Sequence, residues 1–403
     1  MKAVTFHAIG DIRVEDVPEP VIEQPTDAIV RLTASAICGT DLHFVRGTFP
    51  GMKKGQILGH EGVGVVERVG PEVRDIRVGQ RVVIPSTIAC GTCRYCREGG
   101  FAQCDNANPQ GKRAGTCFFG GPEAAGGYKG LQAELARTPW ADTNLVALPD
   151  AISDDQAILM SDILPTGWFG ADLAQVGEGE TVAVFGCGPV GLMAIASAFV
   201  MGAGRVIAVD RLHDRLAMAG KLGAEVVNFD EVEVAKTIVE MTGGDGVDKV
   251  VEAVGVDAQH AQHGPDAPGV LSKAKEAVVQ RLTEPLANAH GRKFVAGDKP
   301  AQSLDWAIEC VRKSGTVAII GVFPPTDREF PIGVAMNKNL TIRMGNANHR
   351  RYYDQLIPLV LSGRLDPVKV LTQVEPMTGA IEAYEAFDKR QPGWIKVELQ
   401  PAA

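Results

Sequence analysis

Three glycines at a fixed spacing, Gly186, Gly188 and Gly191, follow an apolar run of strand length and open a segment rich in helix formers. A second apolar run ends at Asp210, 19 residues after Gly191. This is the pattern of a dinucleotide-binding unit, in which a strand is followed by a glycine-rich turn, a helix and a second strand that ends in an acidic residue. Gly186 would permit the tight turn, Gly188 the approach of the backbone to a pyrophosphate, and Gly191 the packing of helix on strand. The alternative is a buried crossover that binds no ligand.

Strand-like and helix-like segments alternate from residue 181 onward, whereas residues 1 to about 160 show short strand-like runs between glycine- and proline-rich turns. The alternation predicts a parallel sheet covered by helices, and the first part predicts a mostly β domain. We therefore expect an α/β protein of two domains, for which 403 residues suffice. Strands are expected at 28–32, 62–66, 81–85, 205–210, 225–227, 247–254 and 316–320, and helices at 212–222, 232–241 and 353–362.

The charge and composition argue against several classes of partner. The net charge is −9, whereas nucleic acids and anionic membranes attract basic surfaces. No apolar stretch reaches the roughly 18 residues that a membrane-spanning helix requires. The first residues lack the long apolar segment of a secretory signal, so we expect a cytoplasmic protein with small-molecule ligands.

Four cysteines, Cys90, Cys93, Cys96 and Cys104, lie close together in the sequence. Three have C-x-x-C-x-x-C spacing, and the fourth follows eight residues later. Four thiolates fill the coordination sphere of a zinc ion and leave no open position, so this spacing predicts a structural zinc site. An iron–sulfur cluster is the chemical alternative, because four cysteines can also hold one.

A long interruption follows the expected strand at 247–254. The 59 residues between Gly255 and Gly315 are far more than one crossover helix needs. They include His260 and a helix-like segment at 271–282. The stretch is either a tolerated surface insertion or a lid that folds over the adenine end of the cofactor, around His260, and slows its release.

The order of these motifs resembles the zinc-dependent medium-chain alcohol dehydrogenases. The resemblance covers essentially the whole chain and rests on the four-cysteine lobe, the glycine-rich turn, Cys38-Gly39-Thr40-Asp41-x-His43 and Gly59-His60-Glu61. Within the family, the run 161–167 and the long insertion are similar to glutathione-independent formaldehyde dehydrogenases and formaldehyde dismutases. The resemblance implies a GroES-like, mostly β catalytic domain of residues 1–163 and 324–403. It also implies a Rossmann NAD-binding domain of residues 164–323, with the insertion at about 256–300.

The resemblance further implies two zinc ions per chain and names the residues around the catalytic one. Cys38, His60 and Asp162 match its three ligands. Asp162 stands, as in the formaldehyde subgroup, where most members of the family have a cysteine. Three ligands leave an open position for water or substrate. Other residues match catalytic positions: Thr40 and His43 in a proton relay, and Glu61 as a neighbour of the metal or a transient fourth ligand.

The same resemblance implies the reaction and the cofactor contacts. The reaction is hydride transfer between an alcohol or aldehyde hydrate and nicotinamide, including formaldehyde oxidation or dismutation. Asp210 matches the acid that binds the adenosine ribose, which favours NAD over NADP, and Arg215 is its basic neighbour. Further positions match cofactor contacts: Gly39, Thr166, Gly186, Gly188, Pro189, Val190, Gly191, Val254, His260, Gly321, Val322 and Arg343.

Two other functions are compatible with the sequence. Ser86, four residues before Cys90, stands where relatives commonly have a bulky aromatic residue, so a roomier pocket for a larger alcohol or polyol is the first alternative. The second is a non-catalytic NAD-binding protein that has lost its metal, which the retained Cys38 and His60 disfavour. Members of the family are rarely monomers, and we expect a homodimer or homotetramer.

Overall fold

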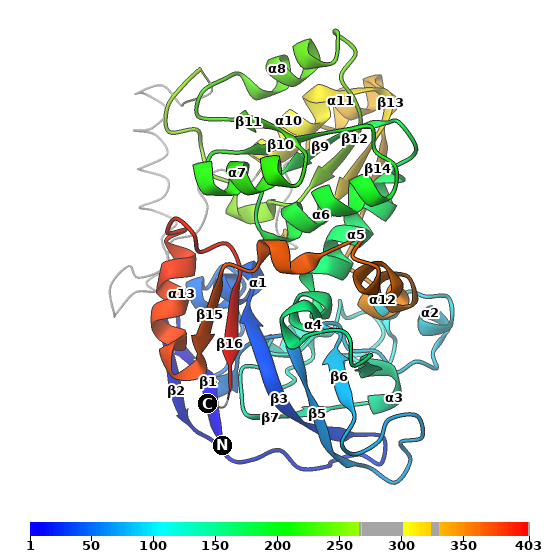
Figure 1. Ribbon diagram of the computed structural model, residues 1–403, viewed down its shortest axis with the longest axis vertical. Coiled ribbons are helices and arrows are strands. Elements are labelled where there is room, and N and C mark those ends of the chain that lie inside the picture. The colour runs from blue at the N-terminus through cyan, green and yellow to red at the C-terminus, as the bar shows by residue number, and fades with distance from the viewer. Residues whose placement is uncertain (266, 268–300, 324–329, 402–403) are drawn as a thin grey trace. The chain divides into compact units, whose positions relative to one another are not determined.

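The computed structural model describes residues 1–265, 267, 301–323 and 330–401. The chain forms two compact units, one of Met1–Thr166 and Asn346–Ala403, the other of Gly167–Gly345. Figure 1 shows the path of the chain through their helices and strands. The expected return to the first domain at residue 324 comes too early. The strand β14 (Thr341–Met344) pairs with β13 (Val311–Ile319) and so still belongs to the sheet of the second unit.

A six-stranded parallel sheet forms the centre of the second unit, with the strand order β11-β10-β9-β12-β13-β14. This is the order of a Rossmann fold, in which the chain starts at an inner strand and reverses direction once. The first four strands along the chain are β9 (Thr181–Phe185), β10 (Arg205–Asp210), β11 (Glu225–Asn228) and β12 (Val247–Glu252). The predicted α/β class with a parallel sheet is therefore confirmed.

Helices cover both faces of this sheet (Figure 1). The consecutive residues Val182, Ala183 and Val184 of β9 are all fully buried, although their side chains alternate between the two faces. The helices are α6 (Pro189–Val200), α7 (His213–Lys221), α8 (Val234–Met241), α10 (Gln302–Cys310) and α11 (Ile332–Asn337). The expected helices at 212–222 and 232–241 are confirmed within two residues at each end, and the helix expected at 271–282 lies outside the described residues.

Two sheets form the first unit, as the mostly β pattern predicted. A three-stranded sheet has the order β2-β1-β4, and a seven-stranded sheet has the order β15-β16-β3-β5-β6-β8 with β7 also paired to β3. Strand β16 pairs with β3, so residues near both ends of the chain share one sheet. The strands are β1 (Lys2–Ala8), β2 (Asp11–Asp16), β3 (Ala28–Ile37), β4 (Gln56–Ile57), β5 (Gly62–Val69), β6 (Arg81–Ile84), β7 (Leu135–Thr138), β8 (Val146–Ala147), β15 (Gln373–Pro376) and β16 (Val397–Gln400).

Two helices of the first unit hold residues of the candidate site. α1 (Gly39–Arg46) follows β3, and Arg46 at its end forms a buried ion pair of 2.7 Å with Asp388 in α13 (Ala380–Asp388). α4 (Asp154–Ser161) is followed by its C-cap residue Asp162, whose backbone angles (φ −140°, ψ −65°) separate this helix from α5 (Ile163–Ala174). Other short elements are α2 (Arg94–Arg97), α3 (Ala141–Asn144), α12 (Tyr353–Leu361), η1 (Phe101–Gln103) and η4 (His349–Arg351). Within the described ranges, no helix has both the length and the apolar character needed to cross a membrane.

Candidate active site and metal-binding groups

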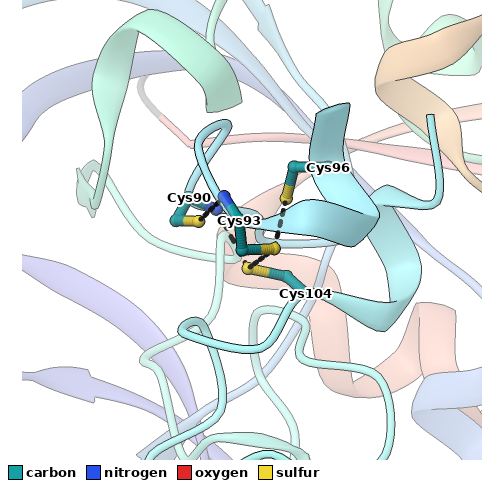
Figure 2. A group of neighbouring side chains, drawn as sticks. All are labelled: Cys90, Cys93, Cys96 and Cys104. Atoms are coloured by element: carbon teal, nitrogen blue, oxygen red, sulfur yellow. Dashed lines mark hydrogen bonds between the residues drawn. The ribbon is translucent and has the colours of Figure 1, made fainter. Parts of the chain in front are cut away.

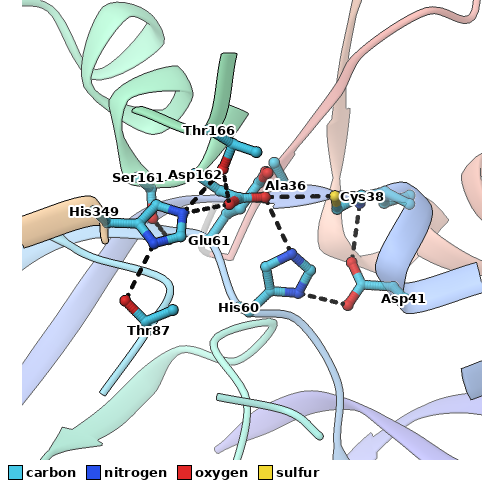
Figure 3. Close-up of polar contacts among 12 residues, drawn as sticks. Ala36, Cys38, Asp41, His60, Glu61, Thr87, Ser161, Asp162, Thr166 and His349 are labelled. Atoms are coloured by element: carbon cyan, nitrogen blue, oxygen red, sulfur yellow. Dashed lines mark hydrogen bonds and ion pairs between the residues drawn. The ribbon is translucent and has the colours of Figure 1, made fainter. Parts of the chain in front are cut away.

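Four buried side chains of the first unit, those of Cys38, His60, Glu61 and Asp162, bring one ligand atom each to within 4.8 Å of one another. Asp162 Oδ2 lies 3.5 Å from the Cys38 sulfur and 3.4 Å from His60 Nε2 (Figure 3). Sulfur, imidazole and carboxylate are donors that zinc binds in open catalytic sites. The structure thus brings together the three predicted ligands of the catalytic metal. We call these three residues and Glu61 the Cys38 group.

The first turn of α1 orients two members of this group. Cys38 is the N-cap residue of the helix, and its backbone N–H donates to Asp41 Oδ2 at 2.9 Å. The other oxygen, Asp41 Oδ1, lies 3.1 Å from His60 Nδ1. When a metal is bound, the proton of His60 stays on Nδ1, which donates it to Asp41, so that the lone pair of Nε2 is available to the metal. Asp41 is therefore the carboxylate that orients the histidine.

The two carboxylate oxygens of Asp162 have different surroundings. Oδ2 faces Cys38 and His60. Oδ1 instead accepts hydrogen bonds from His349 Nε2 at 2.7 Å and from the Thr166 hydroxyl at 3.0 Å. Burial alone would raise the pKa of Asp162, but hydrogen bonds from His349 and His60 outweigh it and hold the pKa well below its usual range. Asp162 is therefore ionised, as a metal ligand must be.

Glu61 is fully buried beside a lysine that is fully buried as well. Lys396, which directly precedes β16, donates to Glu61 Oε2 and, at 3.1 Å, to the carbonyl oxygen of Ile37. Burial raises the pKa of Glu61 to about 7, even though Lys396 acts to lower it. Among the described residues, Glu61 Oε1 has no hydrogen-bond partner. A buried oxygen without a hydrogen bond, next to three metal-type donors, fits a group that binds a cation.

The sulfurs of Cys90, Cys93, Cys96 and Cys104 gather in a lobe around α2 and η1 (Figure 2). They lie within 4.8 Å of one another, and all four cysteines are free thiols. The backbone N–H groups of Thr92 and Cys93 donate to the Cys90 sulfur at 3.4 and 3.3 Å. Although burial opposes it, hydrogen bonds from Thr92 and Cys93 lower the pKa of Cys90 to about 6. A thiolate among four close sulfurs fits the predicted structural metal site.

The residues of the predicted proton relay lie on α1, next to the Cys38 group. Thr40 and His43 are three residues apart on this helix and hence on one face. His43 is buried, and its ring packs edge-on against Phe49 with the centroids 5.4 Å apart. A Cβ added at Gly39, the first residue of the helix, would meet no atom within 4 Å, so the backbone is open there. The passage of a proton through this helix stays a prediction.

The glycine-rich turn joins β9 to α6 in the second unit. Gly186 has a φ of +87°, and a Cβ at Gly191 would lie 1.7 Å from the Gly186 carbonyl oxygen, so both positions require glycine. Gly188 is the N-cap residue of α6, and Pro189 is the first residue of the helix. Arg215 Nη1 lies 3.6 Å from the position of a Cβ at Gly188. The first N–H groups of a helix and a guanidinium therefore lie together, as a pyrophosphate site requires.

Asp210 ends β10 and is hydrogen-bonded back to the same turn. Its Oδ2 accepts from the backbone N–H of Cys187 at 2.8 Å. Its Oδ1 accepts from the N–H groups of Arg211 at 2.7 Å and of Leu212 at 3.0 Å. A carboxylate has about four acceptor sites, so one remains on Oδ2 for a further donor such as a ribose hydroxyl.

The turns that follow β12 and β13 meet around the buried carboxylate of Glu252. Glu252 Oε1 accepts from the backbone N–H groups of Val254 at 2.9 Å and of Gly255 at 2.8 Å. A Cβ at Gly321 would lie 2.3 Å from Glu252 Oε2, so this position requires glycine. Arg343 lies on the edge strand β14 instead. The structure thus brings three predicted cofactor positions to the carboxyl end of the sheet: Val254, Gly321 and Val322.

His260 belongs to the described start of the insertion. Close to it, the backbone N–H of Gln262 donates to Asp230 Oδ1 at 2.6 Å, and Asp230 also pairs with Arg211 at 3.7 Å. This part of the insertion therefore lies beside the loop that follows β11. Most of the insertion lies outside the described residues, so the lid stays a prediction.

Comparison with known proteins identifies the family. Residues 24–150 match the alcohol dehydrogenase GroES-like domain, and residues 189–263 match the zinc-binding dehydrogenase family. The chain is 37% identical over 405 residues to the uncharacterized zinc-type alcohol dehydrogenase-like protein AdhB of Bacillus subtilis (strain 168), and the match covers 100% of both chains. This chain belongs to the zinc-dependent alcohol dehydrogenases.

Two further relatives are similar over nearly the whole chain. The chain is 32% identical over 405 residues to the glutathione-independent formaldehyde dehydrogenase of Pseudomonas aeruginosa (strain LESB58), with 97% of this chain and 96% of that one covered. The solved structure of alcohol dehydrogenase TADH from Thermus sp. ATN1 matches with a TM-score of 0.80 and 34% identity over 99% of each chain. These matches to zinc-type alcohol dehydrogenases favour zinc over an iron–sulfur cluster in the four-cysteine lobe.

Sequence reasoning gives no role to three residues around the Cys38 group. An acid three residues after an N-cap position is a capping signal, and it could have identified Asp41. Lys396 is a single cation in an apolar run, which is a weak signal for a buried ion pair. His349 has no local signal, because it lies 187 residues from Asp162 in the sequence and only the fold brings the two together.

Proposed function

We propose that this zinc-dependent alcohol dehydrogenase oxidises short alcohols or aldehyde hydrates with NAD. Formaldehyde is the leading substrate, and dismutation of an aldehyde is a related activity. The carboxylate of Asp162, grouped with Cys38 and His60, is the observation that carries the proposal, because it replaces the cysteine that most of the family has there. The match to a formaldehyde dehydrogenase supports the same substrate class.

In this proposal Cys38, His60 and Asp162 hold the catalytic zinc, and the four cysteines of the lobe hold the structural one. When bound, the catalytic zinc supplies a Lewis acid that favours loss of the substrate hydroxyl proton near neutral pH. Thr40 and His43 carry this proton away from the buried group towards solvent. Asp41 keeps the imidazole of His60 in the tautomer that a metal ligand needs.

The second unit holds the nicotinamide cofactor in this proposal. The N–H groups at the start of α6 and the guanidinium of Arg215 bind the pyrophosphate, and Asp210 binds a ribose hydroxyl. Val254, Gly321 and Val322 line the site at the carboxyl end of the sheet, where open α/β sheets bind their ligands. The nicotinamide carries the hydride, and the protein orients it.

A substrate panel on the purified, zinc-loaded protein tests the proposal. Formaldehyde, short aldehydes and short alcohols are supplied with NAD, with and without glutathione, and also without added NAD. We expect turnover of the short substrates with NAD that does not depend on glutathione. Aldehyde turnover without added NAD would identify dismutation, and no turnover of any short substrate would contradict the proposal.

A larger alcohol or polyol is the second candidate substrate, favoured by Ser86. This small residue is buried, and its backbone N–H donates to the Ser161 carbonyl oxygen at 3.1 Å, one residue before Asp162. A serine so close to the Cys38 group occupies less volume than the aromatic residue that relatives commonly have. Polyols in the same panel decide between the candidates, since a higher kcat/KM for polyols than for formaldehyde favours the second.

Replacing Asp210 by serine is expected to shift the cofactor preference from NAD towards NADP. The carboxylate would repel a 2′-phosphate and offers its remaining acceptor site to a ribose hydroxyl. A serine is uncharged and does not repel the 2′-phosphate. A hydrogen bond to a charged group contributes on the order of 1.5–3 kcal/mol, so the kcat/KM ratio of NADP to NAD should rise about tenfold or more. Steady-state kinetics with both cofactors measure this ratio.

Asp214→Ser serves as the control, because it removes the same charge from α7 next to Arg215 rather than from the end of β10. Its cofactor ratio should stay close to that of the wild type. Equal wild-type efficiency with NAD and NADP, together with an unchanged ratio in the Asp210→Ser variant, would count against the assigned role.

We also propose that the protein forms a homo-oligomer. In the second unit, Ile332 and Met336 of α11 and Met344 of the edge strand β14 are 72%, 70% and 64% exposed. Large apolar side chains at the edge of a sheet are commonly covered by a partner. Light scattering measures the mass in solution, and a mass of 42.8 kDa, that of one chain, would contradict the proposal.

A further inference from the structure

His349 is buried in the first unit, and both nitrogens of its ring have partners. Its Nε2 lies 2.7 Å from Asp162 Oδ1, and its Nδ1 lies 3.1 Å from the Thr87 hydroxyl (Figure 3). The Thr166 hydroxyl lies 3.1 Å from the same Nε2 and donates to Asp162 Oδ1 at 3.0 Å. His349 therefore stands directly behind a ligand of the proposed catalytic zinc.

The chemistry of the partners defines which nitrogen of His349 carries the proton. An ionised carboxylate only accepts hydrogen bonds, so Nε2 must donate to Asp162 Oδ1. The Thr87 hydroxyl can donate to Nδ1, which then presents its lone pair. Thr87 thereby selects the tautomer and the ring orientation in which His349 points an N–H group at Asp162.

The backbone around His349 is fixed by two asparagines. Asn348 Oδ1 accepts from the backbone N–H of Ala102, in the four-cysteine lobe, at 2.9 Å. Asn346 Nδ2 donates to the Thr116 hydroxyl at 2.6 Å. The position of the imidazole is therefore set by contacts outside the Cys38 group, as a preorganised supporting residue requires.

We infer that His349 is a positioning residue that makes Asp162 a one-oxygen metal ligand. Two donors, His349 and Thr166, engage Oδ1, so only Oδ2 is turned to the Cys38 sulfur and to His60 Nε2. Without the imidazole only the Thr166 hydroxyl holds Oδ1, so the carboxylate rotates more readily and can present either oxygen. Partners behind a metal ligand typically contribute about 10–100-fold in metal affinity or activity. The inference rests on the proposed catalytic zinc and adds to it a residue that touches neither metal nor substrate.

Zinc retention by the holoenzyme tests this inference. His349→Leu removes the donor while keeping an apolar side chain of moderate size. We expect it to release zinc from the Cys38 group to a chelator about 10–100 times faster than the wild type. The zinc of the four-cysteine lobe should stay bound. His349→Gln keeps a side-chain N–H donor and should restore most of the retention. Thr87→Val, close in shape to the wild type, removes the hydroxyl that orients the ring and should give a smaller increase in release.

Cobalt(II) placed in the Cys38 group gives a second readout, because its visible absorption depends on ligand geometry. We expect His349→Leu and Thr87→Val to shift these bands. Tyr353→Phe is the matched control, since it removes a buried hydrogen bond of 2.9 Å to the Met160 carbonyl oxygen without touching the Asp162 carboxylate. Its zinc release and cobalt spectrum should match the wild type.

The outcomes separate this inference from the proposed function. If His349→Leu and Thr87→Val match Tyr353→Phe in both readouts while the wild type holds its zinc, the inference is wrong and the proposed function stands. If the wild type holds no zinc in the Cys38 group, the proposed function fails as well. If His349→Leu does not fold, the Thr87→Val variant decides, and wild-type zinc release and an unshifted cobalt spectrum in that variant would overturn the inference.

Discussion

Replacing Asp162 by alanine is expected to remove zinc from the Cys38 group and to lower kcat/KM about a thousandfold or more. A Lewis-acid metal contributes several kcal/mol to catalysis, and about 4 kcal/mol corresponds to a factor of a thousand. Cys38 and His60 alone leave too few ligands for tight binding. The zinc content should fall from two equivalents per chain to one, since the four-cysteine lobe is a separate group. Metal analysis and steady-state kinetics measure both changes.

Two further variants control for the loss of a buried carboxylate. Asp162→Cys restores the residue that most of the family has and should keep the zinc and part of the activity. Asp27→Ala removes another buried carboxylate of the first unit, one that pairs with Arg137 at 2.8 Å and belongs to neither metal-type group. It should lower stability while both zinc equivalents remain. Two bound zinc ions and wild-type kcat/KM in Asp162→Ala would contradict the assignment of this residue as a ligand.

The fold was predictable where a local backbone geometry requires a particular residue type. Gly186 must be glycine because its φ is positive, and Gly191 because a Cβ there would lie 1.7 Å from the Gly186 carbonyl oxygen. Both requirements leave a mark in the sequence, since both residues are glycines at a recognisable spacing. The strand predicted at 316–320 instead begins at Val311, since Val311 pairs with Val247 before a shift in register. That pairing joins residues far apart in the sequence, so no local sequence pattern predicts it. The same holds for β14, whose four residues are part of the second unit only through their partner strand.

The candidate site was predictable for its ligands and not for their surroundings. Cysteine and histidine are chemically specific residues, and the resemblance of their motifs to the zinc-dependent alcohol dehydrogenases implies Cys38, His60 and Asp162 as ligands. The contacts that orient them depend on tertiary structure. His349 reaches Asp162 from the segment that follows the second unit, and Lys396 reaches Glu61 from the edge of β16. One sequence contains no signal for these pairs, because the partners lie far apart along the chain and the role of each comes only from its neighbour in the fold.

Replacing Cys93 by alanine is expected to release the zinc of the four-cysteine lobe and to lower the melting temperature by about 10 °C or more. Structural zinc contributes its binding free energy directly to folding, and removal of one ligand from a closed four-sulfur site forfeits much of it. For a domain the size of the first unit, which holds the lobe, each kcal/mol corresponds to about 2–4 °C, so the loss of several kcal/mol gives a shift of this order. Calorimetry together with metal analysis measures the effect.

Cys117→Ala is the matched control for this change. Cys117 is buried in the same unit, with its sulfur 3.5 Å from the Ala107 carbonyl oxygen, and lies outside both metal-type groups. It should lose stability without losing zinc.

The two variants should also differ at the catalytic group, because the lobe holds Asn348 through the backbone N–H of Ala102, and His349 is the next residue. Loosening the lobe therefore loosens the support of Asp162, and Cys93→Ala should release the catalytic zinc a few times faster than Cys117→Ala. Equal melting temperatures and two zinc equivalents in both variants would show that the four sulfurs hold no metal that stabilises the fold.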